Sequence, residues 1–380
     1  MHGVCAKMFT RVIIQNFLSL RNVEIPLGKV SVLIGPNASG KSNVARAFQL
    51  IAKHAKGEEP ALDSYKSLRD LSFNFNPKID IYIALDMPIE ITDYWYSLQL
   101  TSRSYEERIG RKNEVVISHA GEKSEAEIKT AEGATPVPLN SITESRYYHG
   151  LLYRSVLTSL PSDIDREIRH LASNLRNICV HSFTPDMLRL SNSVSENPIL
   201  DYHGRNLARY LLHLYTERRK DFGRIEETLK GMIPEIEEVI PHIERTNVEV
   251  WIKIKEVDEP LKPHNISDGT LRLLAMIAAL YGGSSLVVLE EPENCIHSYL
   301  LETFMHLVRD SPSQVLITTH SPYLLDYVKP EEVYVVWKEG LETKAKKLST
   351  AKEMERVKRF LEEGGTLGEA WYSGIFGGTP

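Results

Sequence analysis

Short apolar and alternating segments at the start of the chain predict β strands. Residues 8–14, 17–20 and 23–27 are rich in β-branched residues and leucine and are broken by polar pairs that contain asparagine. Residues 30–34 form an almost uniformly apolar run that predicts a further strand. Between residues 71 and 133, alternation predicts an antiparallel meander with strands at 79–85, 95–100, 114–118 and 125–130. We expect its aromatic residues to pack in the sheet rather than to stack on bases: Tyr82, Tyr94, Trp95 and Tyr96.

Helical spacing of apolar residues follows the first strands and dominates the middle of the chain. Residues 140–230 are expected to be mainly helical, with one short strand at 178–183. The predicted helices cover residues 43–54, 165–175, 206–215 and 271–280, and further strands are predicted at 248–254, 285–289 and 314–319. Strands that alternate with helices favour a mostly parallel α/β sheet, whose ligands bind beyond the carboxyl ends of the strands.

One segment between a predicted strand and a predicted helix carries specific chemistry. It reads GPNASGKS and fits the G-x-x-x-x-G-K-S pattern of a phosphate-binding loop. Two glycines permit backbone angles and a close approach that a Cβ would block. Backbone amides at the helix start point at phosphate oxygens, Lys41 supplies charge to the β- and γ-phosphates, and the Ser42 hydroxyl can ligate Mg²⁺. We therefore expect a nucleoside triphosphate to contact Gly35, Pro36, Asn37, Ala38, Ser39, Gly40, Lys41, Ser42 and Asn43.

Polar residues at the ends of later strands form a second candidate group. Glu290 and Glu291 follow an apolar run, and neighbouring strand residues point in opposite directions, so one carboxylate can meet Mg²⁺ while the other faces the attacking water. His320 follows residues 314–319 and can bond a γ-phosphate or that water. Ser267 and Gly269 open a helix and form a second anion-ready N-terminus. Taken singly, each has a plainer interpretation: a polar strand end, a structural histidine or a capping serine.

Composition narrows the class of protein. The chain has 380 residues, a net charge of −6 and no overall basic field of the kind that attracts nucleic acid. Its three cysteines, Cys5, Cys179 and Cys295, are too far apart for a CxxC motif or a disulfide framework, which suits a reducing cytosol. No signal peptide or membrane-length apolar stretch is present, so a cytoplasmic protein without a membrane partner is expected. A solvated helix face is favoured over a DNA-facing patch for Arg205, Arg209, Arg218, Arg219, Lys220 and Arg224.

Four ordered motifs resemble those of ABC-type ATPase heads. GPNASGKS, ISDGT, LVVLEEPE and TTHSP are similar to the Walker A, signature, Walker B and switch-histidine motifs. The chain most resembles the SMC/RecF/OLD-like branch, and DYHGRNLARYL at residues 201–211 is similar to a segment of its short predicted AAA-family ATPases without a Toprim nuclease domain. The resemblance implies an α/β P-loop NTPase fold with a mixed central sheet and an N-terminal antiparallel β subdomain. The expected parts are an N-terminal ATPase lobe (1–135), a mainly helical insertion (136–245) and a C-terminal ATPase lobe (246–380).

The resemblance also implies roles for individual residues. Lys41 and the loop amides would bind ATP, Ser42 and Glu290 would serve Mg²⁺, Glu291 would be the general base and His320 the γ-phosphate sensor. ATP would close a head-to-tail homodimer in which a second protomer reaches the γ-phosphate through Ser267, Asp268 and Gly269. Hydrolysis would reopen it.

The sequence departs from the family pattern at several points. Glu290 stands where an aspartate is usual, and Asp268 where a glycine is usual. No glutamine is placed as the Q-loop residue, because Gln49 lies in another predicted helix and residues 71–76 offer asparagines. About sixty residues follow His320, too few for a Toprim domain. Any nuclease activity is therefore expected from a partner.

The leading functional hypothesis is an ATP-hydrolysing switch in DNA repair, DNA maintenance or anti-phage defence, acting with DNA or a partner effector. Two alternatives stay open. One is the nucleotide-binding subunit of a membrane transporter, against which the separation of about 225 residues between the phosphate loop and ISDGT argues. The other is a non-hydrolysing ATP-sensing scaffold, which ATPase activity of the purified protein would exclude.

Overall fold

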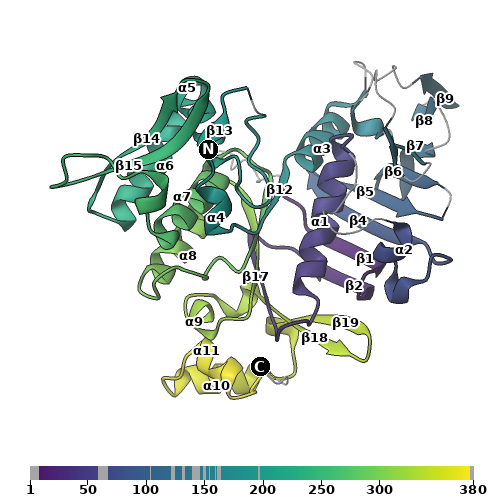
Figure 1. Cartoon of the computed structure of the whole chain (residues 1–380). Helices are drawn as coiled ribbons and strands as arrows, with labels where there is room; N and C mark the ends of the chain where they lie inside the picture. The colour runs from purple at the N-terminus through teal and green to yellow at the C-terminus, as the bar shows by residue number, and fades with distance from the viewer. Residues whose placement is uncertain are drawn as a thin grey trace.

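A mixed six-stranded sheet lies at the centre of the computed structural model (Figure 1). The structure describes residues 8–58, 67–102, 104–120, 125–130, 133–138, 146–148, 151–153, 155–158, 160, 164–195 and 197–376, so Cys5 lies outside the described residues. The strands run in the order β12 (Ile178–His181), β16 (Leu286–Glu290), β17 (Gln314–Thr319), β3 (Val30–Ile34), β18 (Val333–Glu339) and β19 (Glu342–Lys347). Neighbouring strands are parallel except for the antiparallel pair β18–β19.

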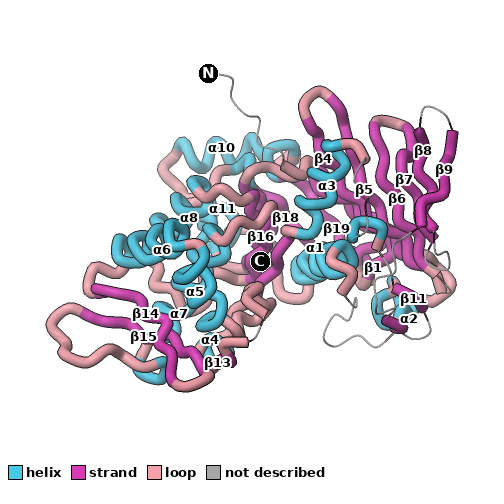
Figure 2. Tube along the Cα trace, turned by 90° about the horizontal axis from the view of Figure 1, so that it is seen from above, coloured by secondary structure: helices cyan, strands magenta, loops and turns pink. Residues whose placement is uncertain are grey.

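The central sheet is buried on both faces, which explains its nearly continuous apolar strands. Val30, Val32 and Ile34 pack into one hydrophobic core, and Leu33 packs into the other. The first core is covered by α5 (Leu207–Glu217), α6 (Arg219–Met232), α7 (Asp268–Tyr281) and α8 (Leu300–Asp310). The second core is covered by α1 (Lys41–Ala55) and α3 (Arg166–Arg176). Figure 2 shows these two groups of helices on opposite sides of the sheet.

An eight-stranded antiparallel sheet packs beyond α1 and confirms the predicted meander. Residues 17–20 are not a separate strand as predicted: Phe17 ends the first strand and pairs with Leu20, because Leu18 adopts a φ of +53° and begins a two-residue turn. Tyr94 and Tyr96 are buried in the sheet, as expected. Its strands are β2 (Leu20–Pro26), β1 (Arg11–Phe17), β4 (Ile81–Ile89), β5 (Thr92–Leu100), β6 (Tyr105–Arg111), β7 (Glu114–Ala120), β8 (Glu125–Thr130) and β9 (Gly133–Pro138).

A three-stranded sheet lies beside the first group of helices and contains the predicted strand at 248–254. Its strands are β13 (Asn192–Ser193), β15 (Asn247–Ile254) and β14 (Ile236–Glu244). Sequence analysis missed β14, whose alternation is broken by a register shift between Ile236 and Glu238. The remaining strands and α helices are β10 (Arg146–Tyr148), β11 (Leu151–Tyr153), α2 (Leu68–Leu71), α4 (Pro185–Leu188), α9 (Pro322–Leu325), α10 (Met354–Glu362) and α11 (Leu367–Tyr372). Short 3₁₀ turns cover Phe73–Phe75, Val156–Thr158, Pro263–Asn265, Pro330–Glu332 and Leu348–Thr350. Within the described ranges, no helix is both long and apolar enough to cross a bilayer.

A buried carboxylate joins α1 to the antiparallel sheet. Glu107 on β6 and His54 on α1 are both fully buried, with 3.4 Å between the Glu107 Oε2 and His54 Nε2 atoms. The Glu107 carboxylate also accepts hydrogen bonds from the hydroxyls of Tyr96 and Ser155 and from the backbone N–H of Val156, at 2.7–3.0 Å. Burial by itself raises the pKa of Glu107, but the attraction of His54 and these hydrogen bonds lower the pKa below its ordinary value.

Removing this carboxylate is expected to destabilise the fold strongly. Glu107→Ala should lower the free energy of unfolding by about 3–5 kcal/mol, because it leaves buried partners uncompensated. The neighbouring Glu106→Ala serves as the control, since Glu106 pairs with Arg108 at the surface, where such pairs contribute about 0–1 kcal/mol. Urea unfolding of both variants measures the difference.

The same pair of variants has a defined pH dependence. Because the pKa of Glu107 is lower in the folded chain than its ordinary value of 4.5, the stabilisation is fully present above that value. It is lost as the pH falls through the lowered pKa. The difference in the free energy of unfolding between wild type and Glu107→Ala should therefore become smaller as the pH falls. A difference that grows below pH 4.5 would contradict this account.

Candidate functional site

The phosphate loop connects β3 to α1, and residues of β18 and β19 pack closely against it. A Cβ at Gly35 would collide with the backbone oxygen of Val336, and Gly40 has a φ of +104° that favours glycine. The Thr343 hydroxyl donates to the Ser39 backbone oxygen at 2.9 Å and lies 2.7 Å from the Ser19 hydroxyl. The loop conformation is thus held by long-range contacts as well as by its own glycines.

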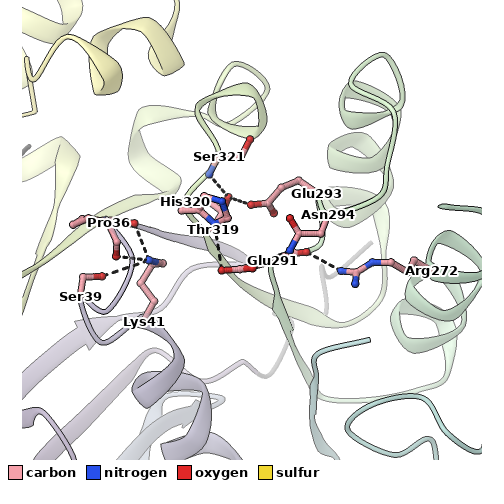
Figure 3. Close-up of polar contacts among 11 residues, drawn as sticks. Pro36, Ser39, Lys41, Arg272, Glu291, Glu293, Asn294, Thr319, His320 and Ser321 are labelled. Carbon is pink, nitrogen blue, oxygen red and sulfur yellow. Dashed lines mark hydrogen bonds and ion pairs between the residues drawn. The ribbon is translucent and has the colours of Figure 1, made fainter. Parts of the chain in front are cut away.

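Lys41 is turned into the loop (Figure 3). Its Nζ donates to the backbone oxygens of Gly35 and Pro36 at 2.7 and 2.9 Å. Burial lowers the pKa of Lys41, while the charges of Glu291 and Glu293 raise it. The ammonium group therefore lies close to both the loop and the carboxylates that follow β16.

The other predicted loop residues differ in exposure and contacts. The Asn43 amide donates to the Ser19 hydroxyl at 2.7 Å and holds the start of α1 against the turn between β1 and β2. Ala38 adopts a φ of +62° and, with Asn37, forms the exposed tip of the loop. Ser42 is half-buried in the first turn of α1.

Glu290 and Glu291 point to different partners, as the strand geometry predicts. Glu290 ends β16, is 8% exposed, and its Oε1 accepts a hydrogen bond of 2.6 Å from the Tyr202 hydroxyl. Glu291 turns the chain with a φ of +47°. Its Oε1 lies 3.2 Å from His320 Nδ1, and its Oε2 accepts from the Asn294 amide at 2.8 Å (Figure 3).

Parallel pairing of β16 with β17 explains this convergence. Glu290 is opposite Thr318, and the Glu291 N–H donates to the Thr318 backbone oxygen at 2.8 Å. His320 follows two residues later and so meets the Glu291 side chain. The structure therefore brings Glu291 and His320 together. The charge of the Glu291 carboxylate also raises the pKa of Lys41, against the larger effect of burial.

Sequence reasoning missed the third glutamate of the EEPE segment. Glu293 Oε1 accepts a hydrogen bond of 2.5 Å from the Thr319 hydroxyl, and burial raises the pKa of Glu293. Its other carboxylate oxygen is buried and has no hydrogen-bond partner within the described residues. The sequence did contain a signal for this residue. Glu293 follows Glu291 by two positions, and the next predicted strand, 314–319, ends in Thr319.

The ISDGT segment lies at the start of α7, on the other face of the central sheet from α1 (Figures 1 and 2). The Ser267 hydroxyl accepts from the Thr270 backbone N–H at 3.2 Å and so caps the helix. Asp268 forms an ion pair of 2.6 Å with Arg189. A Cβ at Gly269 would lie 2.5 Å from the Cys295 backbone oxygen, so the helix start packs closely on the turn after Glu291.

Arg272 connects α7 to that turn. Its guanidinium is buried and donates to the Glu291 backbone oxygen at 2.9 Å (Figure 3). It also donates to the Phe183 backbone oxygen. Burial lowers the pKa of Arg272, and the nearby acidic residues oppose this. The predicted residues thus form two groups: Lys41, Glu290, Glu291 and His320 beside the loop, and Ser267, Asp268 and Gly269 at the start of α7.

The donors beside the phosphate loop fit a Mg²⁺ ion that arrives with a nucleotide. Mg²⁺ prefers oxygen ligands and is commonly held by one or two carboxylates together with substrate phosphates. Ser42 and Glu290 supply a hydroxyl and a carboxylate, and Glu290 Oε2 forms no hydrogen bond with the described residues. Among those residues, no group of three or more His, Cys, Asp or Glu side chains forms a metal cage.

Much of the basic cluster is paired within the chain. Arg218 forms an ion pair with Asp221, and Arg205 lies 3.6 Å from Asp201. The Arg219 guanidinium lies over the Tyr215 ring, and that of Arg224 over the Tyr281 ring. The basic residues do not lie on one helix as predicted: Arg205 lies in the turn before α5, Arg218 lies between α5 and α6, and Arg219 and Arg224 lie on α6.

Comparisons with known proteins agree with the fold and the motifs. The family model described as "AAA domain, putative AbiEii toxin, Type IV TA system" matches residues 30–326. An OLD nuclease of Thermus scotoductus (strain ATCC 700910 / SA-01) is 30% identical over 82 residues, which is 21% of this chain and only 15% of the length of that nuclease.

Two solved structures share the fold. An SmcHead bound to the C-winged helix domain of ScpA has a TM-score of 0.55 at 14% identity, with 92% of this chain and 99% of that chain covered. An Smc head domain with an extended coiled coil, bound to the C-terminal domain of ScpA derived from Pyrococcus furiosus, has a TM-score of 0.55 at 13% identity, with 94% and 99% covered.

The fold is therefore that of an ABC-type P-loop ATPase head. The family model covers most of the chain. GPNASGKS, LVVLEEPE and TTHSP lie at the carboxyl ends of the neighbouring parallel strands β3, β16 and β17, while ISDGT opens α7. The chain belongs to the AAA-domain family of that description, within the SMC/RecF/OLD-like branch of ATPases.

Proposed function

We propose that this protein binds and hydrolyses ATP with Mg²⁺. The observation that carries the proposal is the contact between Glu291 and His320 at the edge of the sheet where the phosphate loop also lies. A phosphate-binding loop, a partly exposed carboxylate and a histidine in contact are the groups that phosphoryl transfer to water needs.

Each residue has a defined task in this mechanism. Lys41 exchanges its bonds to the loop oxygens for bonds to the β- and γ-phosphates. Glu291 accepts the proton of the attacking water, and His320 orients that carboxylate and contacts the γ-phosphate. Ser42 and Glu290 would hold Mg²⁺, and this ion would neutralise part of the negative charge of the phosphates.

We further propose that ATP closes a two-fold symmetric, head-to-tail dimer. Within one chain, α1 and α7 cover opposite faces of the sheet, so Ser267, Asp268 and Gly269 are separate from the phosphate loop. A second copy can present its α7 N-terminus to the γ-phosphate, where a helix N-terminus favours an anion. Two equivalent sites follow from the symmetry of such a dimer.

The proposed biological role is a cytoplasmic switch in DNA repair, DNA maintenance or anti-phage defence. Support comes from the family model, whose description names a type IV toxin–antitoxin system, and from the similarity to an OLD nuclease. The similar SMC heads are bound to domains of ScpA, which makes a partner effector protein a reasonable expectation for this chain. A gel-shift series at rising salt tests direct DNA binding, since phosphate contacts must weaken with salt.

Glu291→Gln should separate nucleotide binding from hydrolysis. We expect ATP affinity to be retained and phosphate release to fall by about 10²–10⁴-fold, the usual contribution of a general base. Light scattering with Mg-ATP should show accumulated dimer. Glu302→Gln is the matched control, because Glu302 is an exposed glutamate on α8. An unchanged rate in Glu291→Gln would remove this residue from the mechanism, and a wild-type protein that binds but never hydrolyses ATP would favour a sensing scaffold.

Mixing two inactive variants tests the composite site. Lys41→Ala disables the phosphate loop, and Ser267→Arg blocks the start of α7. A mixed dimer contains one intact site, built from the loop of one variant and the α7 of the other. With random pairing, equal mixing should restore about a quarter of wild-type activity. No recovery in the mixture, with both variants folded and able to exchange subunits, would argue against shared sites.

A further inference from the structure

Tyr202 makes a contact that the proposed roles do not explain. It lies in the DYHGRNLARYL segment, and its hydroxyl donates to Glu290 Oε1 at 2.6 Å. No other hydrogen bond to the Glu290 side chain is formed within the described part of the chain. The tyrosine thus takes one carboxylate oxygen and leaves Oε2 for another ligand.

The backbone around Tyr202 is fixed to the chain that continues from β12. The Tyr202 backbone oxygen accepts from the Ser182 N–H at 2.8 Å. His181 Nδ1 lies 3.0 Å from the Asp201 backbone oxygen, and the Asp201 N–H donates to the Asn206 side chain at 2.9 Å. Since His181 of β12 is opposite Leu289 of β16, the loop is anchored on the strand next to Glu290. The position of the tyrosine hydroxyl is therefore set by the central sheet.

This contact gives a physical reason for a glutamate at this position. A glutamate has one more rotatable bond than an aspartate, so it loses more side-chain entropy when it is held for a ligand. A hydrogen bond to Oε1 restricts that freedom before any ligand binds. Outer-shell hydrogen bonds of this kind orient metal-binding carboxylates.

We propose that Tyr202 is a positioning residue that orients Glu290 toward the divalent cation bound with the nucleotide. The inference rests on the proposed function, because it assumes that Glu290 serves Mg²⁺. Tyr202 forms no hydrogen bond with the phosphate loop or with Glu291 within the described residues, so in this proposal its effect on the cation passes through Glu290. It should influence the metal requirement and leave metal-free nucleotide binding unchanged.

Tyr202→Phe tests this with a binding measurement rather than with activity. The affinity for a fluorescent ATP analogue is measured in EDTA and during a Mg²⁺ titration. We expect the affinity for the analogue in EDTA to be unchanged. The Mg²⁺ concentration needed to reach half of the metal-dependent increase in affinity should rise by about tenfold or more. Phenylalanine keeps the ring that lines a neighbouring cavity of about 830 Å³, so packing there is preserved.

Tyr210→Phe is the matched control, since Tyr210 is a buried tyrosine of the same segment that belongs to the hydrophobic core on α5. Glu290→Gln provides the second reference. If Tyr202 acts through Glu290, Tyr202→Phe should change the Mg²⁺ requirement no further in the Glu290→Gln background.

The outcomes separate the two proposals. A Glu290→Gln protein with a wild-type Mg²⁺ requirement would overturn the metal role of Glu290 in the proposed function. A changed requirement in Glu290→Gln, together with a Tyr202→Phe protein that behaves like Tyr210→Phe, would overturn only the inference about Tyr202. Loss of affinity in EDTA and of thermal stability in Tyr202→Phe would show a structural role and would also overturn it.

Discussion

Parallel pairing of β16, β17 and β3 is the constraint on which the candidate site depends. Thr318 is opposite Glu290 on one side and Leu33 on the other, so the three strands end at one edge of the sheet. Because all three strands are buried, their register is specified by the two cores that they separate. The phosphate loop, the Glu291 turn and His320 are consequently brought together, although they lie far apart in the sequence.

The second consequence of this sheet is the separation of the two helix N-termini. Alternate residues of β3 face different cores, and α1 covers one core while α7 covers the other. Arg272 then links α7 to the Glu291 backbone, so the start of α7 and the turn that carries Glu291 are connected by a hydrogen bond. In the proposed dimer, a γ-phosphate bound to the loop of one copy would contact α7 of the other copy and so act on the Glu291 turn of the copy that supplies α7.

Local patterns predicted the parts of the site that local sequence determines. The phosphate loop is a contiguous segment, and Glu290, Glu291 and His320 directly follow apolar strands, so each could be placed without the fold. Tyr202, in contrast, reaches Glu290 across 88 positions, and the Thr319 contact to Glu293 depends on strand register. The same limit applies to the fold: the hairpin at Leu18 was read as part of a strand, and the bulge in β14 concealed that strand.

The central claim is that one triphosphate is bound between two copies of the chain. A crystal structure of the Glu291→Gln protein with Mg-ATP tests it most directly. Our account predicts a γ-phosphate in contact with Lys41 of one copy and with the α7 N-terminus at Ser267 of the other, with Mg²⁺ beside Ser42 and Glu290. A nucleotide bound to a single copy with no second α7 near its γ-phosphate, or an empty phosphate loop, would contradict it.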